Sequence, residues 1–241
     1  PLKLYSGIDV FVLLSIPGFI IAGNLMNQGG LTDKIINFCN HLLGHIRGGL
    51  SYVNICASML FAGISGTAIS DTASLGSVMI PAMKKEGYDS DFSCAITAAS
   101  STVGPIIPPS LPMIIAATLS GLSVGKLFLA GAIPGLLLGM GLMLVAYFVA
   151  KKKNYHKHQK SPPLQVLKSF IDTFWALLMT LIILFGIIGG VFTPTEASLG
   201  AVLYALFIGT FVYKKLNLKN ISVVILDSMK TTASLMILVG F

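Results

Sequence analysis

Several stretches of this chain are apolar enough to lie in a membrane, and two of them are interrupted near their middle. A helix needs about 20 apolar residues to cross the hydrocarbon core of a bilayer. Unbroken runs approach that length at 8–28, 124–150, 170–192 and 196–213, and a fifth begins near Ile221. With 54% hydrophobic and 10% charged residues, the chain lacks the roughly 25% charged residues of an average soluble domain. The sequence therefore predicts an all-α polytopic membrane protein.

The first interrupted stretch, 49–83, has a small and polar centre at 63–72. As helices, its legs 49–62 and 72–83 would be only about 21 Å and about 18 Å long, against a hydrocarbon core of about 30 Å. Neither leg spans the bilayer alone. We therefore expect a re-entrant helical hairpin that enters and leaves by one face, with its tip buried in protein or lining a wet cavity.

The second interrupted stretch, 92–121, contains four of the eleven prolines of the chain. They are Pro105, Pro108, Pro109 and Pro112. Inside a helix each proline removes a backbone donor and clashes with the preceding turn, at about 3 kcal/mol or more. The stretch is therefore predicted to be a transmembrane helix that is broken at 104–112.

The basic residues indicate how the chain is oriented. If the hairpin and the broken helix are as predicted, thirteen of the sixteen Lys and Arg residues fall on one face, including those of a basic linker at 151–169. Lys3 and Lys126 fall on the other face, and Lys230 lies within a predicted span. Because loops rich in Lys and Arg stay inside, the basic face is predicted to be cytoplasmic.

When the predicted crossings are counted along the chain, the runs 8–28 and 221–241 cross the membrane in opposite directions. We therefore expect 214–241 to open a second, inverted repeat, which is how many secondary transporters are built. The chain has no initiator Met and stops inside an apolar run. We expect it to be an internal part of a longer membrane protein.

Sequence motifs of enzymes are weak or missing. Gly63-Ile64-Ser65-Gly66 has the G-x-S-G form of intramembrane serine proteases, whose serine needs a histidine as base. The four histidines all lie in polar linkers, at positions 41, 45, 156 and 158. His41 and His45 have metal-ligand spacing, but no third ligand follows at helical spacing. There is no P-loop motif, and we expect no enzymatic activity.

Two other classes are also disfavoured. The basic residues are not interleaved with aromatics and lie mostly in linkers, so the net charge of +7 does not indicate nucleic-acid binding. Cys39, Cys56 and Cys94 sit in or beside apolar sequence without paired spacing, and we expect three reduced thiols.

The two breaks are the best candidates for a binding site. Half-helix N-termini attract anions, while unwound carbonyls and half-helix C-termini coordinate Na⁺. Proline-kinked packing helices with small residues at close crossings are the structural alternative. Asp71 is an acidic residue near the centre of an apolar region, where it either caps the second leg of the hairpin, binds an ion, or does both. Glu196 is predicted to form a capping box with Thr193, which has a structural role.

Eight segments of the chain carry a combined pattern of small, polar and proline residues. They are Gly29-Gly30, Gly44-His45, Arg47–Leu50, Met59–Ala68, Ile80–Met83, Gly87–Asp89, Gly104–Ser110 and Phe192–Ala197. In this order they strongly resemble the large membrane subunit of TRAP (tripartite ATP-independent periplasmic) transporters. The resemblance is specific, because the interrupted regions match in sequence as well as in place.

This resemblance implies an inverted-repeat, elevator-type secondary transporter in the bacterial inner membrane. Such a transporter imports an organic acid anion that a periplasmic substrate-binding protein delivers, and the large subunit pairs with a small four-helix membrane subunit. Na⁺ is the coupling ion, and no cofactor is expected. Residues 1–48 would be scaffold and arm helices, 49–121 half of the moving transport domain, and 122–213 scaffold helices.

The resemblance also implies a site at the hairpin tip and the helix break. The residues expected to bind substrate or ion are Ser65, Gly66, Thr67, Asp71, Gly104, Pro105, Pro108 and Ser110, with Na⁺ at Ser65, Gly66, Gly104 and Pro108. Thr67 stands where serine is commoner in the family, which keeps the hydroxyl. An ion channel is the alternative, since hairpins and broken helices also build selectivity filters. The sequence does not indicate which acid is carried.

Overall fold

The computed structural model describes residues 10–153, 155 and 160–240, and all regular elements within these ranges are helical. In chain order the elements are η1 (Phe11–Leu14), α2 (Ser15–Gln28), α3 (Leu31–Leu43), α4 (Gly49–Ser65), α5 (Ala68–Lys85), α6 (Ser90–Ser101), α7 (Leu111–Ser120), α8 (Val124–Lys153), α9 (Pro163–Ile188), α10 (Pro194–Phe207), η2 (Ile208–Val212) and α11 (Leu218–Gly240).

The five predicted unbroken spans are confirmed as helices that are long and apolar enough to cross a membrane. Their boundaries differ from prediction by a few residues, most of all at α9. Helix α9 occupies Pro163–Ile188 rather than 170–192, because Pro163 stands at its first position, where the missing N–H of proline costs nothing. The basic linker is therefore shorter than the predicted 151–169, since α8 continues to Lys153.

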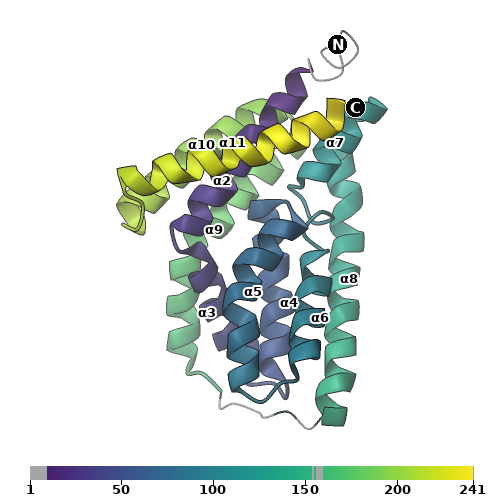
Figure 1. Ribbon diagram of the computed structural model, residues 1–241, viewed down its shortest axis with the longest axis vertical. Coiled ribbons are helices and arrows are strands. Elements are labelled where there is room, and N and C mark those ends of the chain that lie inside the picture. The colour runs from purple at the N-terminus through teal and green to yellow at the C-terminus, as the bar shows by residue number, and fades with distance from the viewer. Residues whose placement is uncertain (1–9, 154, 156–159, 241) are drawn as a thin grey trace.

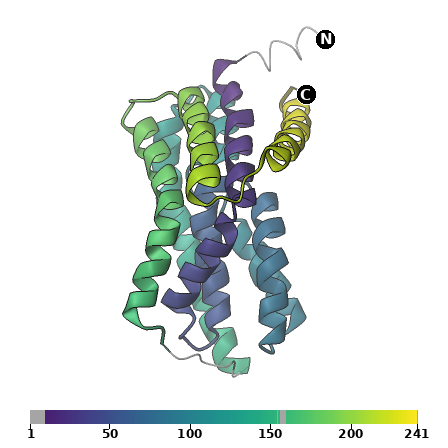
Figure 2. The ribbon, with the colours of Figure 1, turned by 90° about the vertical axis from the view of Figure 1, so that its left-hand side faces the viewer.

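The helices form two groups (Figures 1 and 2). Helices α2, α10 and α11 lie at the upper end of the molecule, and α2 packs against both of the others. Helices α3, α4, α5 and α6 form the lower part, with α9 along one side and α8 along the other. Helix α8 packs against α4, α6 and α7 as well as α9. It therefore contacts the region 49–121, predicted as half of the transport domain, and the region 122–213, predicted as scaffold.

Helices α4 and α5 form an antiparallel hairpin (Figure 1). The predicted non-helical centre at 63–72 is wrong in extent, since only Gly66 and Thr67 separate the two helices. Gly66 has a φ of 61°, which favours glycine, and its N–H donates to the Ala62 carbonyl. The side chain of Thr67 then accepts a hydrogen bond from the Ser70 N–H and begins α5. The helical hairpin is confirmed, and its re-entrant path through a bilayer stays a prediction.

The predicted helix break is present between α6 and α7. It spans 102–110, two residues earlier than the predicted 104–112. Helix α7 begins at Leu111 because Ser110 caps it and Pro112 lies in its first turn, where a proline is tolerated.

A buried polar seam joins the hairpin to the broken helix. The Asn54 side-chain amide donates to Thr97 Oγ1 at 2.6 Å, and the hydroxyls of Ser58 and Ser100 are 2.9 Å apart. All four residues are fully buried. Hydrogen bonds between buried groups replace those lost to solvent, so α4 and α6 are held in a fixed register.

Candidate functional site

The hairpin tip and the helix break, 45 residues apart in sequence, meet end to end. The Leu111 N–H at the start of α7 donates a hydrogen bond to the Gly66 carbonyl at 3.4 Å. A Cβ at position 66 would lie 3.2 Å from the Leu111 nitrogen and 3.3 Å from the Pro109 carbonyl oxygen. The contact therefore needs glycine for its space as well as for its φ, and it brings the C-terminus of α4 to the N-terminus of α7.

Ser110 organises the break from the other side. Its side chain accepts a hydrogen bond from the Met113 N–H, which caps α7, and its hydroxyl donates to the Pro105 carbonyl at 2.6 Å. Ser110 is only 1% exposed. The same hydroxyl thus closes the non-helical segment into a loop and fixes where the positive end of the α7 dipole points.

Asp71 lies in α5, four residues after Thr67 of the tip, and is fully buried. The Ser65 hydroxyl donates to Asp71 Oδ1. The second oxygen, Oδ2, has no hydrogen-bond partner among the described residues. A Cβ at position 104 would lie 2.8 Å from it, so the carboxylate faces the helix break at Gly104. The possibility that Asp71 caps the second leg is wrong, because Thr67 caps α5 and Asp71 lies one turn further along.

Two cavities adjoin the tip, and they differ greatly in size. The smaller, of about 10 Å³, lies between Phe19, the tip and the break, where Ser65, Gly66 and Ser110 line it. That volume is close to the minimum for one water molecule. The larger, of about 460 Å³, lies between the tip, α2 and α11, and falls in the range of sites for small organic ligands. Ser65 lines both cavities.

The predicted site residues divide between these places. Ser65, Gly66 and Ser110 surround the small cavity, whereas Thr67 faces the large one. Gly104 lies against Asp71, and the Pro105 carbonyl accepts from Ser110. The Pro108 carbonyl oxygen lies 3.6 Å from where a Cβ of Gly63 would be, on the α4 side of the break. The four residues predicted to bind Na⁺ therefore do not all line one cavity.

Several residues at the site had no signal in the sequence. Thr180 of α9 donates its hydroxyl to the Gly63 carbonyl at 3.2 Å. A Cβ at Gly23 of α2 would lie 3.0 Å from the Ile64 carbonyl oxygen. Asn24 lines the large cavity from α2, and Asp227, which does have a signal as an acidic residue within an apolar run, lines it from α11. The others look in the sequence like parts of ordinary spans, and only the packing of α2 and α9 around the tip identifies them.

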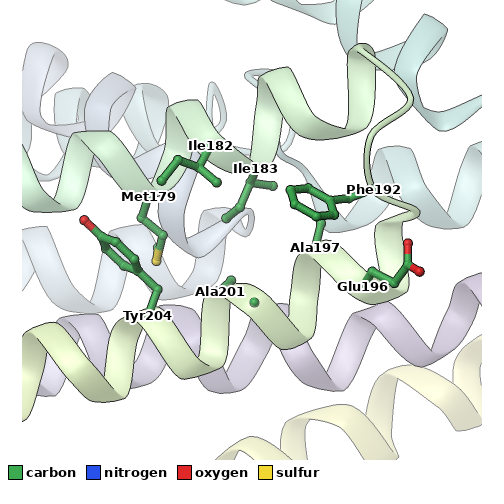
Figure 3. A pocket seen from close by; sticks show the side chains of 9 residues that line it. Met179, Ile182, Ile183, Phe192, Glu196, Ala197, Ala201 and Tyr204 are labelled. Carbon is green, nitrogen blue, oxygen red and sulfur yellow. The ribbon is translucent and has the colours of Figure 1, made fainter.

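A separate apolar cavity of about 130 Å³ lies between α9 and α10 (Figure 3). The polar groups at its edge already have partners. Glu196 accepts from the Thr193 N–H, which confirms the predicted capping box, and the Tyr204 hydroxyl donates to the Trp175 carbonyl. The Glu196 and Tyr204 side chains serve these structural hydrogen bonds and the other lining side chains are apolar, so the tip and the break remain the candidate site.

Comparison with known proteins agrees with this architecture. A family model described as "Tripartite ATP-independent periplasmic transporter, DctM component" matches residues 1–240. The chain is 45% identical to a sialic acid TRAP transporter large permease protein of Vibrio cholerae, over 98% of this chain and 56% of the relative. It is 41% identical to a C4-dicarboxylate TRAP transporter large permease protein of Pseudomonas aeruginosa, over 99% of this chain and 56% of the relative. A 2,3-diketo-L-gulonate TRAP transporter large permease protein of Escherichia coli is 40% identical over 98% of this chain and 56% of the relative. The chain thus spans just over half the length of these relatives.

Proposed function

The chain belongs to the family of DctM components of tripartite ATP-independent periplasmic transporters, and we propose that it forms part of the large membrane subunit of a Na⁺-coupled secondary transporter. It is a multi-pass membrane protein, which we place in the bacterial inner membrane. Its relatives are named as transporter permeases, and transport rather than enzymatic catalysis is the proposed activity.

The observation that carries this proposal is the pair of cavities on either side of Ser65. The small cavity has room for a single ion, and Ser65, which lines it, donates to the buried Asp71, whose second oxygen is unpartnered and lies beside Gly104. Carboxylate, hydroxyl and carbonyl oxygens are suitable ligands for a hard cation such as Na⁺. An ion held between tip and break would stabilise the tip as a wall of the larger cavity, and this is how we propose that Na⁺ favours substrate binding.

The substrate that we propose for the larger cavity is an organic acid anion. The relatives are named for sialic acid, C4-dicarboxylate and 2,3-diketo-L-gulonate, which are all acids. In this chain the cavity is lined by Asn24, Thr67, Ser70 and Thr231, among others. These side chains offer hydroxyl and amide donors to a carboxylate or to sugar hydroxyls.

The proposed mechanism is of the elevator type. The hairpin α4–α5 and the broken helix α6–α7 would form half of the moving domain, and a hairpin and broken helix from the rest of the protein would form the other half. We further propose a small four-helix membrane subunit and a periplasmic substrate-binding protein as partners. Residues 214–241 would open the second, inverted repeat.

Uptake into proteoliposomes tests the proposal against an ion channel. The complete large subunit, reconstituted with its small subunit, should accumulate a labelled acid only with an inward Na⁺ gradient and the binding protein. Uptake should saturate with substrate. Flux that rises linearly with substrate, and that neither Na⁺ nor the binding protein affects, would support a channel instead. A panel of competing acids in the same assay identifies the substrate.

A further inference from the structure

A groove at the lower end of the molecule combines an apolar floor with basic groups at its rim. It lies between the last turns of α3 and the first turns of α9, and its volume is about 580 Å³. Phe38, Leu42, Leu167 and Phe170 line it, and the rings of Phe38 and Phe170 pack with their centroids 5.7 Å apart. Leu167 is 56% exposed and Leu42 is 41% exposed. The groove therefore exposes several large apolar side chains next to one another.

Lys160, His41 and His45 line the same groove, and none of the described lining residues is acidic. His41 Nδ1 lies 3.0 Å from the Ser161 hydroxyl, which ties α3 to the segment that leads into α9. Lys160 is exposed, and its side chain takes part in none of the ion pairs found among the described residues. The groove therefore has the charge that complements an anionic group.

The groove also continues into a surface suited to hydrocarbon. Helix α9 is apolar and long enough to span a membrane, and beyond Phe170 its outer side exposes Ile171 and Phe174. A ligand that fits both parts has a negatively charged head beside Lys160 and a long apolar tail that runs along α9. A soluble anion would leave the apolar floor uncovered.

We propose that this groove binds an anionic phospholipid of the adjoining leaflet. The headgroup phosphate contacts Lys160 and the two histidines, and an acyl chain covers Leu42, Leu167 and Phe170. Bound there, the lipid joins α3 to α9, two helices that flank the hairpin. The proposal concerns a different place from the candidate transport site, and its outcome does not depend on the substrate.

Native mass spectrometry of the complete permease with its small subunit, purified in detergent, tests the proposal. Phosphatidylglycerol should give a bound adduct at lower concentration than phosphatidylcholine. Removing one basic group next to a lipid phosphate weakens binding by about fivefold, which corresponds to about 1 kcal/mol per Lys near an anionic surface. We therefore expect Lys160→Gln to raise the phosphatidylglycerol concentration needed for the adduct by about that factor.

Lys168→Gln is the matched control, because Lys168 is an exposed lysine of α9 that does not line the groove. It should leave binding unchanged. Equal losses in the two variants would show that only the overall surface charge matters, and would overturn the proposal. So would equal binding of the two lipids, or binding that appears only when the small subunit is absent, since the groove would then be a protein interface.

Discussion

Gly66 is a residue at which the site tolerates no side chain. Gly121 provides a comparison, because it has a similar positive φ of 65° but no heavy atom within 4 Å of its Cβ position. An L-residue in the left-handed region costs about 1–2 kcal/mol, so both Gly→Ala variants should lose this amount. Gly66→Ala should lose more, because its Cβ would press on Leu111 and Pro109. Thermal unfolding of the two purified variants measures the difference, and equal losses would mean that the tip does not dock on the break.

The substitution Asp71→Asn tests whether the buried carboxylate binds Na⁺ through its negative charge. Asn at this position keeps an acceptor for the Ser65 hydroxyl and removes the charge that would face Na⁺. A charged side chain at membrane depth costs at least about 2.5–3.5 kcal/mol unless it is compensated, so Asp71→Asn should assemble as well as the parent protein. We expect uptake at limiting Na⁺ to fall by tenfold or more, an order-of-magnitude estimate for losing about 1.4 kcal/mol of ion binding.

Two comparisons make the Asp71 result decisive. Uptake measured against Na⁺ concentration separates a weakened ion site, in which saturating Na⁺ restores part of the rate, from a damaged fold. Asp91→Asn is the control, because Asp91 is an exposed acid in the first turn of α6 that lines neither cavity at the tip. If Asp71→Asn transported like the parent protein at limiting Na⁺, the carboxylate would have only a structural role.

At the scale of elements, the hairpin depends on how α5 begins. Thr67 supplies the cap, since its hydroxyl accepts from the Ser70 N–H. Removing such a cap costs about 1 kcal/mol. Thr67→Ala should therefore lower the unfolding temperature, whereas Thr67→Ser, which keeps the hydroxyl, should not. An unchanged melting curve for Thr67→Ala would show that packing alone holds the tip.

The sequence predicted the elements better than their junctions. Apolar runs and clustered prolines located five spans, the hairpin and the helix break, because hydrocarbon permits few alternatives to a helix. The tip was predicted as ten residues and is two, since small polar residues such as Ser65 and Thr72 remain helical when their hydroxyls find partners. No periodicity could reveal that Gly66 meets Leu111 or that Thr180 reaches Gly63, because these contacts arise from packing between distant segments.

At the scale of the whole molecule, the linkers gather at two ends. The α5–α6 turn, the C-terminal end of α8 and the N-terminal end of α9 lie at the lower end, and the α7–α8 and α9–α10 turns lie at the upper end (Figures 1 and 2). An ion pair at 2.8 Å between Lys153 and Asp89 joins the end of α8 to the α5–α6 turn. The Lys153 ammonium holds the pKa of the Asp89 carboxyl below its usual value. The α10–α11 loop lies instead beside the start of α3, where Lys215 pairs with Asp33.

This arrangement predicts which positions an impermeant thiol reagent can reach. In a background in which Cys39, Cys56 and Cys94 are replaced by Ser, cysteines at Lys85 and Lys160 should both be labelled only from the cytoplasm, because basic loops stay inside. A cysteine at Thr193 should be labelled only from outside.

The broken helix and α8 separate Lys85 from Lys160 by two full crossings, so both positions should lie on one face. A further cysteine at Arg47, in the linker before α4, tests the hairpin itself, because a re-entrant hairpin leaves Arg47 and Lys85 on the same face. A cysteine at Ser123, in the turn between α7 and α8, is the internal control and should behave like the one at Thr193, since one crossing separates it from Lys85. Labelling of Arg47 and Lys85 from opposite faces would exclude the re-entrant hairpin, and with it the placement of Ser65 and Asp71 at membrane depth on which the proposed Na⁺ site depends.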